Sequence, residues 1–280
     1  MKAFPEFVGM DTSFWAFIKF ISETLGYTER GKGKVKSYFH TEIIRLCEET
    51  NTFIDMRLIN AAVEYLNQRS KLLNDEVQYL LMDAETARSE FDRIFEHYNQ
   101  NNFLCNIPLN KQKGDMRQVA YYTAIINIIA EDTIRRITRN SHDLGFDDDP
   151  RGLSFIWDED GYIIGGSSRR FDGAYPSIQN PRLVWEIKEY YYATTFGSRV
   201  ADGVYETQLD GYEFKELFER TGIKVYHVLF VDAYRTWWVQ GKSYLCRLID
   251  ALNSGLVDEV IFGREVFTRW SKILEETLLD

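Results

Sequence analysis

Residues 183–188 read Leu-Val-Trp-Glu-Ile-Lys, and this stretch decides how we interpret the chain. The segment around it, residues 182–192, is rich in Val, Trp, Ile and Tyr, a composition that predicts a β-strand. Alternate side chains of a strand point to opposite faces. We therefore expect Glu186 and Lys188 to share one face, while Ile187 points the other way into apolar surroundings.

A second carboxylate precedes this strand. Residues 167–172 read Ser-Ser-Arg-Arg-Phe-Asp, so Asp172 could converge with Glu186 and Lys188. Two carboxylates and an ammonium group can hold a divalent cation and position a water for attack on a phosphodiester. The alternative interpretation is that Glu186 and Lys188 form a surface pair and that Asp172 lies in a turn.

These residues resemble the catalytic core of the PD-(D/E)xK nucleases, the restriction-endonuclease-like superfamily. Phe171 stands where that family usually has Pro. The resemblance implies that Asp172, Glu186 and Lys188 are catalytic and that DNA is the substrate. It also implies that Asp172 and Glu186 bind Mg²⁺, for which Mn²⁺ can substitute.

A second motif lies downstream. Residues 208–212 read Gln-Leu-Asp-Gly-Tyr and resemble the Q-x-x-x-Y element of RecB-like nucleases, in which it lies on the next helix. That resemblance implies that Gln208 and Tyr212 contact substrate or support the metal site, although both could equally pack a helix on the sheet. Arg169 and Arg170, beside Asp172, are candidate contacts to phosphate.

The order of elements extends the resemblance over roughly residues 117–232. Hydrophobic periodicity and turn signals predict an alternation of helices and strands from about residue 116. The expected elements are a helix at 117–139, a hairpin at 152–157 and 162–164, strands at 168–174 and 183–191, a helix at 202–220 and a strand at 224–231. We expect an α/β fold with a mixed sheet and an αβββαβ restriction-endonuclease-like core. Two helices and a short strand at 257–262 should follow.

The first third of the chain has a different pattern. Apolar spacings of three and four predict helices at 13–25, 37–49, 55–73 and 76–99. We expect a helical region over residues 1–105, for binding DNA, binding a partner or dimerisation. The nuclease domain should occupy residues 106–280.

Composition limits the classes of function. A net charge of -10 disfavours a protein that coats nucleic acid nonspecifically, because phosphate binding depends on clustered Lys and Arg. No run of 18 apolar residues and no secretory leader is evident, so we expect no membrane partner and a cytoplasmic location. Cys47, Cys105 and Cys246 lack the spacing of a metal site, and they indicate free thiols.

We interpret the chain as a Mg²⁺-dependent DNA endonuclease, acting in restriction or another defence against foreign DNA. The sequence has no Walker loop, so we expect no nucleotide cofactor. By analogy with the family we expect a homodimer. Two alternatives stay open, namely a RecB-like exonuclease or repair nuclease, and a non-catalytic DNA-binding or assembly protein that keeps the nuclease fold.

Overall fold

The computed structural model describes residues 1–111, 117–139, 142–192 and 197–279. The chain is a mixed α/β protein. Its α-helices are α1 (Thr12–Leu25), α2 (His40–Glu49), α3 (Met56–Leu72), α4 (Gln78–Leu80), α5 (Ala84–Gln100), α6 (Tyr121–Thr138), α7 (Ser198–Thr221), α8 (Lys242–Asn253) and α9 (Ser271–Leu279). Its strands are β1 (Thr28–Glu29), β2 (Lys34–Val35), β3 (Phe155–Trp157), β4 (Ile163–Gly166), β5 (Gly173–Tyr175), β6 (Leu183–Glu189), β7 (Tyr226–Asp232) and β8 (Glu259–Phe262).

The main sheet has four strands in the order β5-β6-β7-β8. β5 is antiparallel to β6, and β6, β7 and β8 are parallel. Helix α7 connects β6 to β7, and α8 connects β7 to β8. β6 and β7 are buried along nearly their whole length, as expected for strands with a layer of helices on each face.

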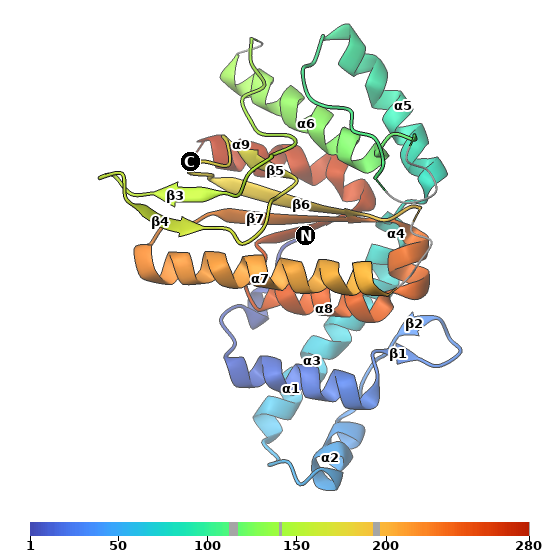
Figure 1. Cartoon of the computed structure of the whole chain (residues 1–280). Helices are drawn as coiled ribbons and strands as arrows, with labels where there is room; N and C mark the ends of the chain where they lie inside the picture. Colours follow the sequence, from blue (N-terminus) through green and yellow to red (C-terminus); the bar gives the residue numbers. More distant parts are fainter. Residues whose placement is uncertain (112–116, 140–141, 193–196, 280) are drawn as a thin grey trace.

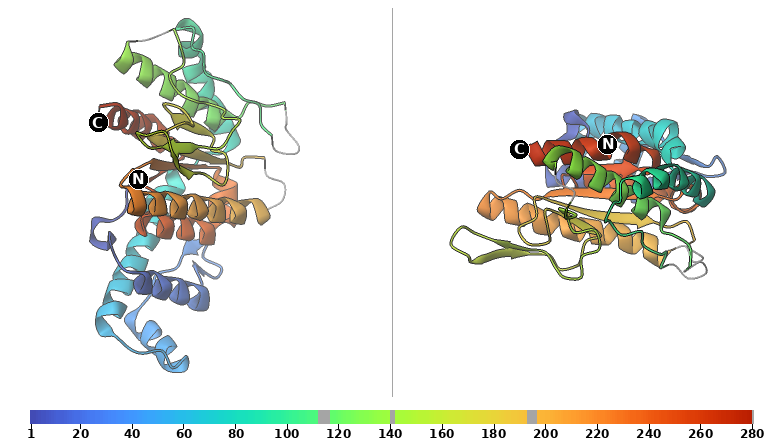
Figure 2. Two further views of the ribbon diagram at one scale, coloured as in Figure 1. Left: turned by 60° about the vertical axis from the view of Figure 1, so that its left-hand side comes forward. Right: turned by 90° about the horizontal axis from the view of Figure 1, so that it is seen from above.

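Helices cover both faces of this sheet. Figure 1 shows α5, α6 and α9 on one side and α7 and α8 on the other, with α1, α2 and α3 beyond α8. The left view of Figure 2 shows the same succession of layers. The layers fix two different environments for β6, one facing α6 and one facing α7.

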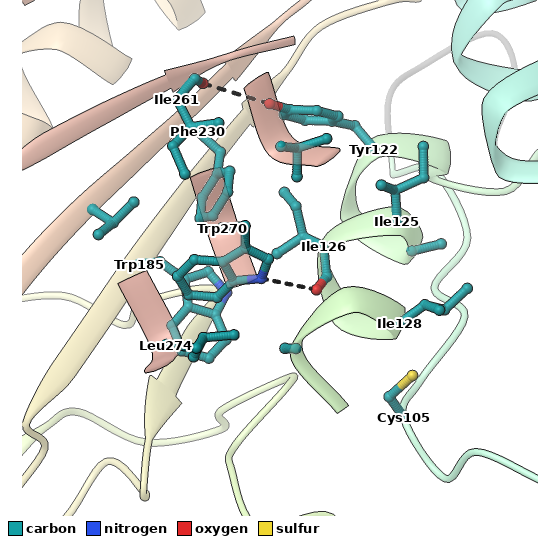
Figure 3. Packing of buried hydrophobic residues seen from close by; sticks show 14 of the residues in the cluster. Cys105, Tyr122, Ile125, Ile126, Ile128, Trp185, Phe230, Ile261, Trp270 and Leu274 are labelled. Atoms are coloured by element: carbon teal, nitrogen blue, oxygen red, sulfur yellow. Dashed lines mark hydrogen bonds between the residues drawn. The ribbon is translucent and has the colours of Figure 1, made fainter. Parts of the chain in front are cut away.

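The core on the α6 side is built around aromatic rings (Figure 3). The Trp270 indole lies edge-on to Trp185 and to Phe230, with ring centroids 5.2 and 5.0 Å apart. Trp270 Nε1 donates a hydrogen bond to the Ile126 carbonyl at 3.1 Å, which ties this core to α6. Gly173 is required beside the core, because a Cβ there would lie 2.1 Å from the Trp185 ring.

One helix expected from the sequence is interrupted. We expected a helix over residues 76–99, but the chain is extended at Leu81 and begins α5 only at Ala84. Met82 N donates to Asp232 Oδ1 at 2.7 Å, and Tyr234 N donates to the Met82 carbonyl. These contacts with the end of β7 stabilise the break, and Asp83 caps the new helix by accepting from Thr86 N.

The expected hairpin is present but lies outside the main sheet. β3 and β4 pair with each other as a separate antiparallel two-stranded sheet. The next expected strand, residues 168–174, is shorter than expected, because β5 begins only at Gly173. Residues 167–172 form an irregular segment before β5, and this segment carries Arg169 and Asp172.

Across the described part of the chain, no helix is both long enough and apolar enough to cross a membrane.

Candidate functional site

Glu186 and Lys188 lie on the α7 face of β6, as the alternation along the strand predicts. Lys188 Nζ donates to Glu186 Oε1 at 2.5 Å and to Glu206 Oε2, on α7, at 2.7 Å. Both β6 side chains are buried. Helix α7 approaches Lys188 closely at Gly203, where a Cβ would lie 3.3 Å from the lysine stem. The ammonium group is therefore fixed between the sheet and α7.

Arg169 joins the same cluster. Its Nη2 lies 2.8 Å from Glu186 Oε1 and 3.2 Å from Glu206 Oε2, and its Nη1 donates to Asp210 Oδ2 at 2.9 Å. One guanidinium thus contacts a carboxylate of β6 and two carboxylates of α7. Arg169 was expected to bind substrate phosphate, whereas its observed partners are acidic side chains.

Two carboxylate oxygens in this cluster lack hydrogen-bond partners among the described residues. They are Glu186 Oε2 and Asp210 Oδ1. Both side chains are buried, since Glu186 is 4% exposed and Asp210 is 0% exposed. Buried polar atoms of folded proteins are nearly always paired, and exceptions often mark a site for a ligand, an ion or ordered water.

Asp172 lies at the edge where β5 separates from β6. Its Oδ2 accepts a hydrogen bond from Ile187 N at 2.7 Å, and its own main-chain N donates to the Trp185 carbonyl at 3.0 Å. The half-buried side chain lines a cleft of about 150 Å³ together with Glu189 and Asp148. Asp172 therefore borders this cleft, and it also lies close enough to Glu186 for that carboxylate to affect its pKa.

Three carboxyl groups of the site, those of Asp172, Asp210 and Glu186, differ in their proton affinity. Burial, followed by the nearby Glu186 carboxylate, raises the pKa of Asp172 to about 7. Burial likewise raises the pKa of Asp210 to about 7, although Arg169 opposes the shift. For Glu186, burial acts to raise the pKa, but Lys188 and Arg169 together hold it below its usual value. Strongly perturbed carboxyl groups beside one another are a feature of functional sites.

Glu189 has a separate role on the α6 face. Its Oε2 accepts hydrogen bonds from Thr123 N and Thr123 Oγ1, at 2.8 and 3.1 Å, in the first turn of α6. Burial raises the pKa of Glu189 to about 7. The carboxyl group therefore satisfies a helix N-terminus and points away from Lys188, while it also lines the Asp172 cleft.

The structure does not bring Gln208 and Tyr212 to Glu186. Both side chains line a different cavity of about 230 Å³ between α7 and α1, where Trp15 and Lys19 also contribute. The Q-x-x-x-Y spacing does place the two residues on one face of α7, but that face is turned toward the N-terminal helices. Arg170 is exposed to solvent.

Sequence reasoning missed Glu206 and Asp210. These residues lie four apart on α7, so their carboxylates project from one helix face toward Arg169 and Lys188. The i, i+4 spacing of two acidic residues was the available signal. Asp210 lies within the Q-x-x-x-Y element, whose resemblance concerns only Gln208 and Tyr212, so its spacing from Glu206 was overlooked.

The carboxylates suit a hard cation, although they do not form a closed cage. No group of three or more His, Cys, Asp or Glu side chains within the described ranges is arranged to hold a metal by itself. Mg²⁺, however, usually keeps several waters and uses only one or two carboxylates. Asp172 and Glu186, with the unpartnered Glu186 oxygen, supply oxygen donors of that kind.

Comparison with known proteins places the chain in a family. A search of curated proteins and a search of solved structures found no match. A family model described as Domain of unknown function (DUF7690) matches residues 1–76, and one described as Domain of unknown function (DUF7687) matches residues 82–277. The division between the two lies at the break before α5, upstream of the boundary expected at residue 105. Because the second match spans more than half of the chain, the protein belongs to the DUF7687 family.

Proposed function

We propose that this protein is a Mg²⁺-dependent DNA endonuclease of the restriction-endonuclease-like type. The observation that carries the proposal is the placement of Lys188 and Glu186 on one face of β6, with Asp172 at the adjoining edge. The site lies toward the carboxyl end of the parallel strands, where open α/β sheets commonly bind ligands. Glu186 is register partner to Leu229 and Lys188 to Val231, so buried neighbours hold both in place.

The topology also supports the proposal. Helix α6 precedes the sheet, an antiparallel strand pairs with β6, and α7 leads to the parallel strand β7. This succession agrees with the later part of an αβββαβ core. It departs from that core at the β3-β4 hairpin, which lies apart from the main sheet.

Each residue would have a task that its position allows. A bound Mg²⁺ would polarise the scissile phosphate and lower the pKa of a water molecule. Asp172 and Glu186 would hold the cation. Lys188 would donate hydrogen bonds to the attacking water and offset negative charge that develops on the phosphate. The buried position of Lys188 keeps this donor aimed before substrate arrives.

The direct test is DNA cleavage with purified protein. Supercoiled and linear DNA, methylated and unmethylated, would be incubated with Mg²⁺, Mn²⁺ or EDTA, using wild type, Asp172→Asn and Glu186→Gln. We expect discrete fragments that require metal and that disappear in both variants. Cleavage that survives both substitutions would refute the assigned site, and progressive loss from DNA ends would instead establish an exonuclease.

The second candidate is a DNA-binding or assembly protein without catalysis. The contact of Arg169 and Lys188 with Glu186 favours it, because two cations already neutralise this carboxylate. Absence of metal binding by the wild type, together with retained DNA binding, would establish this role.

Host defence by restriction and a homodimeric assembly are part of the proposal. Two copies would supply two sites, one for each strand of a duplex. Light scattering after size-exclusion chromatography, with and without DNA, measures the assembly. A monomer under both conditions would exclude the homodimer.

A further inference from the structure

The Arg169 guanidinium contacts three carboxylates. Glu186, Glu206 and Asp210 all contact it, at 2.8, 3.2 and 2.9 Å. Guanidinium groups bind carboxylates through several directed hydrogen bonds, so the arrangement is specific. In the absence of a metal ion, Arg169 stabilises a cluster of acidic side chains that would otherwise repel one another.

The cluster nevertheless keeps an excess of negative groups. Among the described side chains it contains the carboxyl groups of Glu186, Glu206 and Asp210 but only two cations, Arg169 and Lys188. Within the described structure the buried oxygens Glu186 Oε2 and Asp210 Oδ1 remain without partners. Arg169 therefore contacts one oxygen of Glu186 and one of Asp210 and leaves the other oxygen of each available to a second cation.

We propose that Arg169 is a displaceable counter-ion that competes with the divalent cation for the Glu186 carboxylate. This inference rests on the proposed function, because it concerns the same metal site. The guanidinium holds the carboxylates in place while the metal is absent, and it withdraws when the metal binds. Once released, it is a donor pair suited to a phosphate oxygen.

Arg169, and not Lys188, is the group that can move. Lys188 projects from β6, a strand of the main sheet, and its side chain is 4% exposed. Its main-chain carbonyl accepts a hydrogen bond from Trp237 Nε1. Arg169 projects from the irregular segment before β5, and its side chain is 22% exposed. A rotation of the arginine side chain can break its contacts without a change in the sheet, whereas Lys188 has no such freedom.

The test is a Mn²⁺ titration without DNA, in which electron paramagnetic resonance counts the free ion. Removal of a competing cation should tighten binding, so we expect the Mn²⁺ Kd of Arg169→Met to fall about tenfold, since a charged hydrogen bond of this kind commonly has such an effect. Arg170→Met is the matched control, because it removes the same charge from the exposed neighbouring residue. It should change the Kd by less than about twofold, as expected for a solvated charge. Glu186→Gln should abolish binding.

Arg169→Met leaves buried carboxylates without a counter-ion and could unfold the protein. Circular dichroism without metal checks this, and the double variant Arg169→Met/Asp210→Asn, which also removes one carboxylate, provides a second measurement. A folded Arg169 variant whose Kd equals or exceeds that of the wild type would overturn the inference while leaving the proposed metal site intact. No Mn²⁺ binding by wild type or any variant would overturn both.

Discussion

Two arginines of this protein pair with buried carboxylates, yet their surroundings differ. Arg69, on α3, donates from Nη1 to both oxygens of Asp250, on α8, at 2.8 and 2.9 Å. Tyr65 adds a third hydrogen bond to Asp250 Oδ1 at 2.6 Å. Both oxygens of that carboxylate therefore have partners, although Arg69 Nε has none among the described residues. At Arg169, by contrast, the atoms without described partners are acidic oxygens, Glu186 Oε2 and Asp210 Oδ1.

The difference separates a structural ion pair from a candidate site. The Arg69–Asp250 pair joins the N-terminal helices to the layer of α8, and one carboxylate meets one guanidinium. The Arg169 cluster has more carboxylates than cations, and its side chains lie beside the Asp172 cleft. Incomplete hydrogen bonding at buried polar groups costs stability, and natural proteins retain such a cost mainly where function requires it.

The largest expected effect is on the structural pair. Arg69→Met should lower the free energy of unfolding by about 3–5 kcal/mol, because it leaves Asp250 buried without its counter-ion. Arg45→Met is the control, since Arg45 pairs with Glu49 on the exposed face of α2 and should contribute at most about 0.5 kcal/mol. Urea unfolding followed by circular dichroism measures both. Equal midpoints for the two variants would contradict the structural role of Arg69.

The next effect concerns the rate of DNA cleavage. Lys188→Met should reduce the rate about 10²–10³-fold, because it removes a preorganised donor at the position where charge develops. Lys215→Met, which removes a half-exposed lysine from α7, is the matched control and should cleave at the wild-type rate. Single-turnover cleavage with saturating Mg²⁺ measures the step. A Lys188→Met enzyme with full activity would show that the lysine only neutralises Glu186, as Arg69 neutralises Asp250.

A smaller effect depends on pH. His227 is buried between Phe171 and Phe214, and its Nε2 has no partner in the described structure. Burial lowers its pKa to about 4 from the ordinary value of 6.5. The unfolded chain therefore gains a proton between pH 6.5 and 4 that the folded chain does not, so this group contributes full stability above pH 6.5 and loses it as the pH falls.

His227→Phe should remove the loss of stability that His227 causes as the pH falls. Relative to wild type, the variant should gain on the order of 1 kcal/mol of unfolding free energy as the pH falls from 7 to 5, since one pKa unit corresponds to about 1.4 kcal/mol. Urea unfolding at several pH values measures the difference, with His40→Phe at the exposed start of α2 as control. A difference that does not change with pH would mean that His227 titrates normally in the fold.

The sequence predicted the strongly patterned elements well. The apolar run expected at 224–231 is β7, and the helix expected at 202–220 is the central part of α7. These elements are specified locally, by composition and periodicity. The break at Leu81 was not predictable, because it depends on hydrogen bonds from Met82 and Tyr234 to residues distant in sequence. Tertiary contacts there override helix propensity.

The same limit applies to the site. Alternation along β6 was sufficient to place Glu186 and Lys188 on one face. It could not show that the Arg169 side chain reaches α7, or that Asp172 accepts a hydrogen bond from Ile187 N. Both arrangements depend on the irregular segment before β5, for which the sequence has no periodic signal. Gln208 and Tyr212 illustrate the converse, since a correct helical spacing placed them together on a face away from Glu186.

The smallest expected effect is the most direct test of the comparison. Asp210→Asn should change the free energy of unfolding by no more than about 1 kcal/mol, because the amide oxygen still accepts from Arg169 while one of three neighbouring carboxyl groups is removed. Asp250→Asn removes the charge that faces Arg69. It should lower the free energy of unfolding by about 2–3 kcal/mol, because hydrogen bonds between charged groups are weakened at a buried position. Urea midpoints at one pH in EDTA rank the two variants. Asp210→Asn could instead lower the free energy of unfolding as much as Asp250→Asn. The Arg169 cluster would then have the same structural role as the Arg69 pair, and the unpartnered Asp210 oxygen would not indicate a site for a second cation.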